Sequence, residues 1–242
     1  MKLGAFGIIR VALPLFPYGA KVWCPLIVFL TAVNIVYGAM VAMSQKDLKY
    51  VVAYSSVSHM GIVLLGICGL NILSLNGAVF QMFSHGIMTG LFFALVGCIY
   101  GRTHTRMLPE MGGLAKLAPF LAVAFSIAGL ASLGLPGTSG FVAEFLVLLG
   151  AFRTYPVLTI IAATGVVITA IYVLRVLQKI FFGPLNNRYL SGGHQAIVTD
   201  AVLLEKIPLS ILIFLLVILG IWPSFLVNLI NSGVANLLQK IG

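Results

Sequence analysis

Long apolar runs separated by short polar segments constrain this chain more than any other feature of its sequence. A helix needs about 20 predominantly apolar residues to cross the hydrocarbon core of a bilayer. The sequence offers seven candidate runs, at approximately 3–16, 25–44, 50–69, 73–100, 117–152, 155–182 and 207–230. None of them shows the alternation of apolar and polar residues expected of a membrane β-barrel strand. The sequence therefore predicts an all-α polytopic membrane protein with about seven transmembrane helices.

The amino-acid composition argues against a soluble protein and against a nucleic-acid-binding protein. Hydrophobic residues make up 61% of the chain and charged residues only 8%, a balance expected of a protein embedded in a lipid bilayer. The formal net charge is +9, but the basic residues occur singly in short loops and not in a patch with interleaved aromatic residues. We therefore expect the lipid bilayer as a partner and no nucleic acid. The three cysteines lack C-x-x-C spacing, which favours packing roles.

The fifth apolar run, 117–152, contains a segment that disfavours a continuous helix. Pro136 removes one backbone N–H and clashes with the preceding turn, and it pushes Leu135 out of the α region. Neighbouring glycines add conformational freedom, so we expect a discontinuous helix that is broken at 133–140. The residues assigned to the break are Gly134, Pro136, Gly137 and Gly140. No strand is expected before this segment and no lysine follows in Walker spacing, which argues against a nucleotide-binding loop.

The first run is too short to cross a bilayer by itself. At 1.5 Å per residue, 3–16 spans about 21 Å, whereas the hydrocarbon core is about 30 Å thick. Lys2 would then lie partway into the membrane. We expect 1–16 to be a partial transmembrane helix that another polypeptide completes or that only dips into the bilayer. The remaining predicted parts are a five-helix repeat, a linker, and a C-terminal transmembrane helix with its tail, at 25–182, 183–206 and 207–242.

Basic residues in the loops predict the orientation, because short loops rich in Lys and Arg stay on the cytoplasmic or matrix side. The loops after the first, third and fifth runs, with the C-terminus, hold Lys21, Arg153 and Lys240. The loops after the second, fourth and sixth runs, with the end of the sixth, hold Lys46, Lys49, Arg102, Arg106, Lys116, Lys179, Arg188 and Lys206. We therefore expect the second, larger group and the linker 183–206 on the cytoplasmic or matrix side.

Glu144 is the one acidic residue placed within an apolar run. A buried carboxyl group can exchange protons near neutral pH when burial and a nearby cation act on it in opposite directions. The alternative is a structural carboxylate held in a buried hydrogen bond. Because intramembrane ionisable residues mark functional sites by default, we predict proton transfer at Glu144.

Two histidines, His59 and His85, fall in the middle of consecutive apolar runs. Imidazole titrates near physiological pH and can both donate and accept a proton. Each histidine alone fits a packing role, but two at similar depth beside a broken helix and a glutamate favour a proton relay. No second ligand follows either histidine at i+3 or i+4, so we predict no metal site. Lys2, taken alone, is interpreted as an exposed N-terminal residue.

Several segments together resemble the antiporter-like membrane subunits of respiratory complex I, NADH:quinone oxidoreductase. The most specific are Ser-Val-Ser-His-Met-Gly at 56–61 and Pro-Gly-x-x-x-Phe-Val-x-Glu-Phe at 136–145. Lys-Leu-Gly-Ala-Phe-Gly at 2–7 and Met-Gly-Gly-Leu at 111–114 also match, so the resemblance runs through nearly the whole chain. A glutamate at position 144 favours the subunit 4 type, called chain M in bacteria, because the sister subunits 2 and 5 and the Mrp antiporters typically carry lysine there.

The resemblance implies a proton-translocating fold of fourteen helices, built from two inverted five-helix repeats that each contain one broken helix. This chain would be equivalent to the second half: part of the eighth helix, the second repeat and the final helix. By resemblance, Glu144 is the terminal residue that exchanges protons with the outside, and His59 and His85 belong to the central hydrophilic axis. Lys2 matches the lysine that links the two half-channels, which replaces the interpretation of Lys2 as an exposed terminal residue.

The function implied by the resemblance is that of a proton-translocating membrane-arm subunit of complex I, which couples quinone reduction to proton pumping through buried Lys, His and Glu residues. Such a chain is expected to hold no cofactor and no catalytic redox centre; NADH, FMN, iron–sulfur clusters and quinone belong to partner subunits. A separate chain is expected to supply the missing N-terminal helices, with a sequence fragment as the competing explanation. We expect a bacterial inner membrane or, alternatively, the mitochondrial inner membrane. A subunit of an energy-converting hydrogenase, of a formate hydrogenlyase or of an Mrp-type antiporter remains open, as does a structural spacer without transport.

Overall fold

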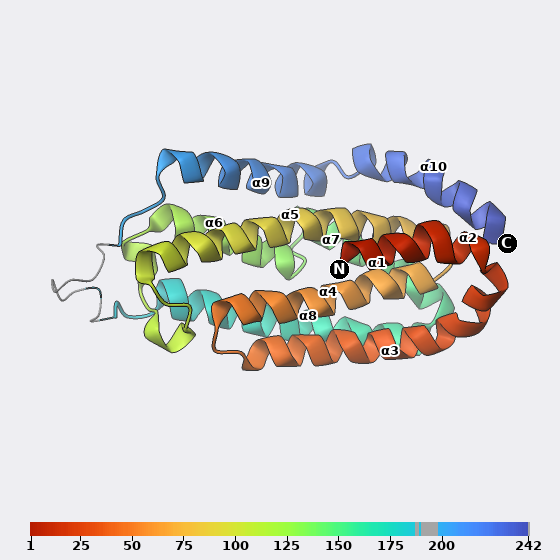
Figure 1. Cartoon of the computed structure of the whole chain (residues 1–242), viewed down its shortest axis with the longest axis horizontal. Coiled ribbons are helices and arrows are strands. Elements are labelled where there is room, and N and C mark those ends of the chain that lie inside the picture. Colours follow the sequence, from red (N-terminus) through yellow and green to blue (C-terminus); the bar gives the residue numbers. More distant parts are fainter. Residues whose placement is uncertain (187–188, 190–197, 242) are drawn as a thin grey trace.

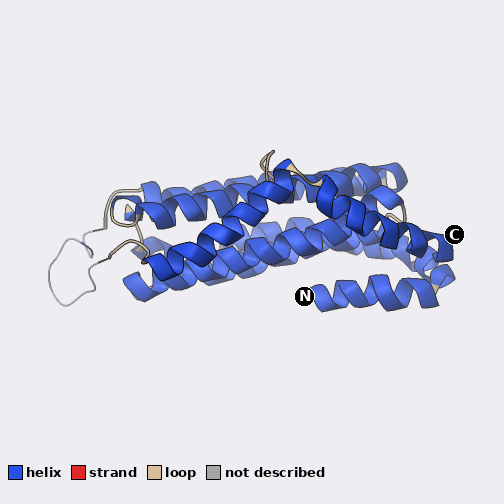
Figure 2. Ribbon diagram, turned by 90° about the horizontal axis from the view of Figure 1, so that it is seen from above, coloured by secondary structure: helices blue, strands red, loops and turns tan. Residues whose placement is uncertain are grey.

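The computed structural model describes residues 1–186, 189 and 198–241, and all regular elements in these ranges are helices. The helices run roughly along one axis and form an elongated bundle (Figure 1), which a second view shows from above (Figure 2). In chain order the elements are α1 (Lys2–Gly7), η1 (Ile8–Ala12), α2 (Leu13–Leu15), α3 (Pro17–Ser44), α4 (Leu48–Cys68), α5 (Ile72–Thr103), η2 (Leu108–Glu110), η3 (Leu114–Lys116), α6 (Pro119–Ser132), α7 (Ser139–Thr154), α8 (Pro156–Leu177), η4 (Gln178–Phe182), α9 (Leu203–Ile221) and α10 (Ser224–Ile241). The apolar runs of the sequence thus form the helices of one bundle.

Five of the described helices are long and apolar enough to cross a membrane: α3, α4, α5, α8 with η4, and α9. The apolar helix α6 is shorter and ends at Ser132, and α7 begins at Ser139. Together α6 and α7 confirm the predicted discontinuous fifth helix. The first helical stretch, α1 to α2, covers only about half the length of the bundle, so its N-terminal end lies near the middle (Figure 1).

The predicted start of the second helix at Pro25 is wrong. Helix α3 begins at Pro17 and contains Pro25 in its interior. The chain turns at Phe16, whose backbone angles (φ −128°, ψ 58°) are not helical. Proline at the first position of a helix is favourable because its missing N–H has no intrahelical partner there. Pro17, and not Pro25, therefore starts this helix.

The last predicted run, 207–230, is also not a single helix. Helices α9 and α10 are separated at Trp222, whose backbone is not helical (φ −123°, ψ 67°), and at the proline that follows it. A proline disfavours the α region for the residue before it, which explains the break. Helix α9 starts at Leu203, inside the predicted linker 183–206. Much of that linker, including Arg188, lies outside the described residues.

Close helix contacts through small residues hold α7 against α5. A Cβ added at Gly77 of α5 would lie 2.6 Å from the backbone nitrogen of Val147 on α7. A Cβ added at Gly150 of α7 would collide with the backbone of Ser74 on α5. Such small residues permit close backbone approach between membrane helices. The second half of the broken helix is therefore held in a fixed position beside α5.

Polar contacts at one end of the bundle fix the first half of the broken helix. The carboxylate of Asp200 accepts hydrogen bonds from the backbone N–H groups of Phe120 and Leu121, in the first turn of α6. A carboxylate is favourable at this position because the helix N-terminus carries partial positive charge. Nearby, Arg102 at the end of α5 forms an ion pair with Glu205 at the start of α9. These contacts join the ends of three helices.

Candidate functional site

The break between α6 and α7 is a tight, glycine-dependent turn. Gly134 and Gly137 have positive φ angles of 72° and 94°, and Pro136 lies between them. The backbone N–H of Leu135 donates to the carbonyl of Leu130 at 3.0 Å, and that of Thr138 donates to the carbonyl of Leu135 at 3.1 Å. The freed backbone groups of the interrupted helix are thus partly paired inside the turn, as a membrane-embedded break requires.

Gly134 also makes room for the carboxylate of Glu144. A Cβ added at Gly134 would lie 3.1 Å from Glu144 Oε2, so the turn folds directly over this side chain. Gly140, which we assigned to the break, instead belongs to the first turn of α7. A Cβ there would collide with the carbonyl oxygen of Ala131. Position 140 requires glycine because α6 and α7 approach each other closely there, and not because of the turn between them.

The carboxylate of Glu144 is buried and is shared by three helices. Glu144 on α7 is 5% exposed, and its Oε1 lies 3.0 Å from Nδ1 of His59 on α4. The side-chain amide of Gln81 on α5 donates to the same oxygen at 3.4 Å. A buried carboxylate is tolerated only when it is paired or hydrogen-bonded. Here the partner is itself a titratable group.

His59 connects this carboxylate to the other half of the broken helix. Its Nε2 lies 3.2 Å from the Ser132 hydroxyl at the end of α6, while its Nδ1 contacts Glu144. Neutral imidazole donates at one nitrogen and accepts at the other, and the protonated ring donates at both. The row Ser132–His59–Glu144 can therefore receive a proton at one end and release one at the other.

His85 is adjacent to this row and lacks polar partners in the described part of the chain. Its ring centroid is 5.4 Å from that of His59, and neither of its ring nitrogens has a hydrogen-bond partner among the described residues. The residue is only 2% exposed. A buried polar group without a partner carries a desolvation cost, so its presence here indicates a role other than packing.

Lys2 lies close to His85 in the fold. A Cβ added at Gly86, the residue after His85, would lie 3.8 Å from Lys2 Nζ. Because α1 begins near the middle of the bundle, Lys2 lies about halfway along it, at the depth expected from the length of the first run (Figure 1). The four predicted residues therefore share one region of the structure: His59 contacts Glu144, His85 is next to His59, and Lys2 is next to the backbone beside His85.

A family model described as NADH:quinone oxidoreductase/Mrp antiporter, transmembrane region, matches residues 1–169 of this chain. The chain belongs to this family.

Individual members of the antiporter family show the same likeness. The chain is 40% identical to NADH-quinone oxidoreductase subunit M of Rickettsia bellii over 240 residues, which are 99% of this chain and 48% of that protein. A chain of respiratory complex I from Thermus thermophilus superposes with a TM-score of 0.91 at 34% identity, covering all of this chain and 50% of the other. The chain thus spans about half the length of the relatives it matches.

The family fold extends to ion antiporters. A chain of the Mrp complex from a Dietzia species superposes with a TM-score of 0.84 at 22% identity, covering 99% of this chain and 53% of the other. At that identity the likeness shows the fold alone. The solved relatives are chains of multi-subunit membrane complexes. The all-α antiporter-like fold predicted from the sequence is confirmed.

The structure adds residues that the sequence analysis left out of the site. Gln81 and Ser132 bind the Glu144–His59 pair directly, and the hydroxyls of Ser84 and Ser139 form a hydrogen bond of 2.7 Å between α5 and α7. Serine and glutamine are common in membrane helix contacts, so their presence alone does not identify a site. The one available signal was the position of Ser132 directly before the predicted break.

Proposed function

We propose that this chain is a proton-translocating membrane-arm subunit of an NADH:quinone oxidoreductase, in which quinone reduction drives protons through Lys2, His85, His59 and Glu144. The observation that carries the proposal is the buried His59–Glu144 pair under the broken helix. Ionisable residues inside a membrane segment mark a functional site by default, and imidazole in contact with a carboxylate is suited to pass a proton. The family membership and the 40% identity to a subunit M support the choice of complex.

The arrangement of the two histidines provides a means of driving the proton. When His59 is protonated, both of its ring nitrogens donate, and the imidazolium is stabilised by Glu144 at 3.0 Å. A positive charge arriving on His85, with ring centroids 5.4 Å apart, would repel it by about 3 kcal/mol at an effective dielectric constant of about 20. That repulsion favours transfer of the Nδ1 proton to Glu144 Oε1 and its release from there.

The rest of the assignment follows from the same proposal. The redox chemistry of NADH, FMN, iron–sulfur clusters and quinone is assigned to partner subunits, and this chain supplies the proton path. The proposed location is a bacterial inner membrane, with the mitochondrial inner membrane as the alternative. The expectation of a separate chain with the N-terminal helices stays a prediction.

A cation/proton antiporter subunit is the second candidate, because the family model that matches this chain includes Mrp antiporters in its description. The two candidates differ in what drives the proton. In the first, proton movement requires NADH and quinone, and sodium has no effect on it. In the second, a sodium gradient alone moves protons.

The test is the substitution Glu144→Gln in membranes that contain the assembled complex. NADH-driven proton uptake into inverted vesicles and the rate of NADH:quinone electron transfer are measured together. We expect the variant to assemble and to lose proton uptake, because glutamine keeps the shape but does not carry a proton. Glu110→Gln, the same change in the short helix η2 between α5 and α6, is the matched control. Normal proton uptake in Glu144→Gln would refute the proposal.

A further inference from the structure

Two adjoining cavities lie between the His59–Glu144 pair and one end of the bundle. The inner cavity, of about 20 Å³, lies between α4, α5, α6 and α8, and its polar lining comes from Ser55, Ser132 and Tyr172. The outer cavity, of about 110 Å³, lies at the loop after α3, and its lining includes Lys46 and Lys179. Three side chains line both cavities and form the partition between them: Val51, Tyr172 and Val176.

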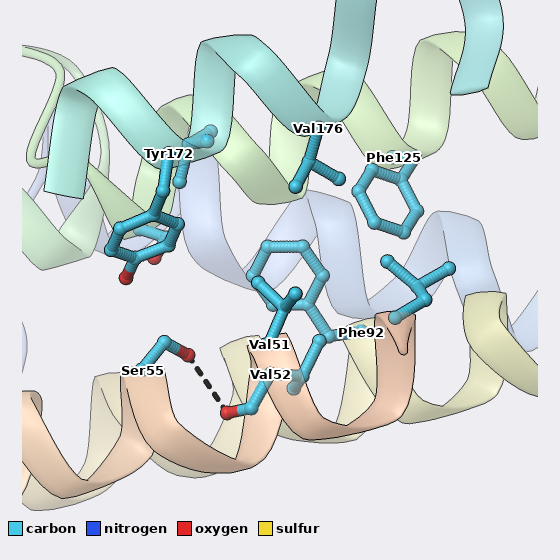
Figure 3. Close-up of a pocket in the computed structure, with 10 residues that line it drawn as sticks. Val51, Val52, Ser55, Phe92, Phe125, Tyr172 and Val176 are labelled. Atoms are coloured by element: carbon cyan, nitrogen blue, oxygen red, sulfur yellow. Dashed lines mark hydrogen bonds between the residues drawn. The ribbon is translucent and has the colours of Figure 1, made fainter. Parts of the chain in front are cut away.

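Tyr172 carries the polar group in this partition. The residue is 2% exposed, and its hydroxyl has no hydrogen-bond partner among the described residues. In the close-up of the inner cavity the hydroxyl points from α8 towards α4, where Ser55 lies (Figure 3). A phenylalanine would fill the same space without the cost of burying an unpaired hydroxyl. Packing alone therefore does not explain why position 172 holds a tyrosine.

The inner cavity ends at the proposed proton relay. Ser132 lines it and lies 3.2 Å from Nε2 of His59. Ser55 lines it as well, and its hydroxyl donates to the carbonyl of Val52, which leaves its oxygen free to accept. The lining is otherwise apolar, but a cavity of this volume can hold about one water molecule where two to four polar groups face it, and Ser55, Ser132 and Tyr172 supply three hydroxyls. Such a water could join the Tyr172 hydroxyl to the serine hydroxyls.

The outer cavity marks the side of the membrane from which this path begins. Besides Lys46 and Lys179, Arg175 lines it. These residues lie at the loop after α3 and at the end of α8, in the group of basic loops that we expect on the cytoplasmic or matrix side. The path thus runs from that side, past Tyr172, to Ser132 and His59.

We infer that Tyr172 passes protons from the cytoplasmic or matrix side to His59, so that this repeat contains an entry path as well as the exit at Glu144. The inference rests on the proposed function. A hydronium ion that enters the outer cavity from the aqueous side gives a proton to the Tyr172 oxygen and is left as water, while the Tyr172 O–H proton moves to water in the inner cavity. Ser132 receives that proton and passes its own to Nε2 of His59. Each hydroxyl gains one proton and loses one, so neither is left ionised.

The test is Tyr172→Phe, which removes only the hydroxyl, in membranes that contain the assembled complex. We expect NADH-driven proton uptake to fall at least fivefold while the thermal unfolding temperature stays the same or rises, because the lost hydroxyl has no partner. Tyr37→Phe, at a residue 62% exposed on α3, is the matched control and should pump normally. A drop in unfolding temperature with unchanged pumping would instead assign Tyr172 a structural role and overturn the inference.

A second measurement keeps the test decisive if Tyr172→Phe fails to assemble. Val176→Cys places a thiol in the partition, and silver ions added from the cytoplasmic side should then block proton uptake. The unsubstituted chain, with its three native cysteines, gives the background. No block by silver would overturn the inference. Loss of pumping in Glu144→Gln with normal pumping in Tyr172→Phe would also overturn it and leave the proposed function intact, whereas normal pumping in both variants would refute the proposed function itself.

Discussion

The proline-associated breaks inside the two predicted runs 117–152 and 207–230 lie next to each other in space but differ in the groups that surround them. A Cβ added at Gly220, near the end of α9, would collide with the backbone of Gly137 and Thr138 in the first break. The first break has two residues with positive φ and covers the buried carboxylate of Glu144. The second consists of Trp222 and its proline neighbour, and Trp222 is 66% exposed.

Only one of the two breaks has paired titratable groups beside it, so a broken helix does not by itself create the proposed proton-transfer site. Proline produces both interruptions by the same steric effect. Only at the first do α4, α5 and α7 bring a histidine, an amide and a carboxylate into contact beside it. Under the proposed function, proton transfer therefore requires both the freed backbone of the break and the paired titratable groups beside it.

The largest expected effect comes from removing the partner of the buried carboxylate. His59→Ala leaves Glu144 without its titratable partner and with only the long hydrogen bond from Gln81, and breaking a buried pair in this way typically costs about 3–5 kcal/mol. We expect proton uptake to be abolished and the thermal unfolding temperature to fall. His104→Ala, in the loop after α5, is the control and should change neither. Pumping at the normal rate in His59→Ala would remove His59 from the relay.

The next largest effect is expected in the first break, where two glycine variants distinguish backbone strain from crowding of the Glu144 carboxylate. Gly134→Ala puts a side chain at φ 72°, with its Cβ 3.1 Å from Glu144 Oε2, whereas Gly137→Ala, at φ 94°, meets nothing within 4 Å. Both should lose about 1–2 kcal/mol of stability from the left-handed backbone. Only Gly134→Ala should also slow proton uptake severalfold, because its methyl group displaces the carboxylate. Equal pumping in the two variants would contradict the crowding argument.

A smaller effect is expected at Gln81. Its amide donates to Glu144 Oε1 at 3.4 Å, a long hydrogen bond that contributes less than the contact with His59. We expect Gln81→Leu to slow proton uptake about two- to threefold without preventing assembly. Initial rates of vesicle acidification measure this directly. A loss as complete as that of His59→Ala would mean that the amide belongs to the relay itself.

The smallest effect is expected at the second break. Trp222→Ala removes a mostly exposed side chain from a turn that holds no titratable group, and surface substitutions of this kind usually change stability by less than about 0.5 kcal/mol. Proton uptake should be unchanged. If this variant lost pumping as Gly134→Ala does, the distinction between the two breaks would fail.

The sequence predicted the features that depend on local chemistry. Pro136 with its neighbouring glycines predicted the first break, and the isolation of Glu144 in an apolar run predicted a buried acid. The sequence predicted the wrong helix boundaries where two local features indicated different boundaries for the same helix. Pro17 and Pro25 were both candidates for a helix start, and in 207–230 the length of the apolar run outweighed the proline after Trp222.

The contacts of the site could not be predicted from the sequence in the same way. His59 and Glu144 are 85 residues apart and meet only because α4 and α7 pack together. Tyr172 and Ser132 are hydroxyl residues in apolar helices, where they resemble ordinary packing residues until their neighbours are known. The hydrophobic pattern determines which segments are helices, but not which faces of those helices meet.

Infrared difference spectroscopy during NADH-driven turnover tests the central claim most directly, because it observes the carboxyl group of Glu144 itself. If this group gains and loses a proton in each cycle, the C=O stretch of a protonated carboxylic acid should rise and fall with turnover. That band should shift in heavy water and disappear in Glu144→Gln. A spectrum in which Glu144→Gln leaves every carboxylic acid band unchanged would contradict the account.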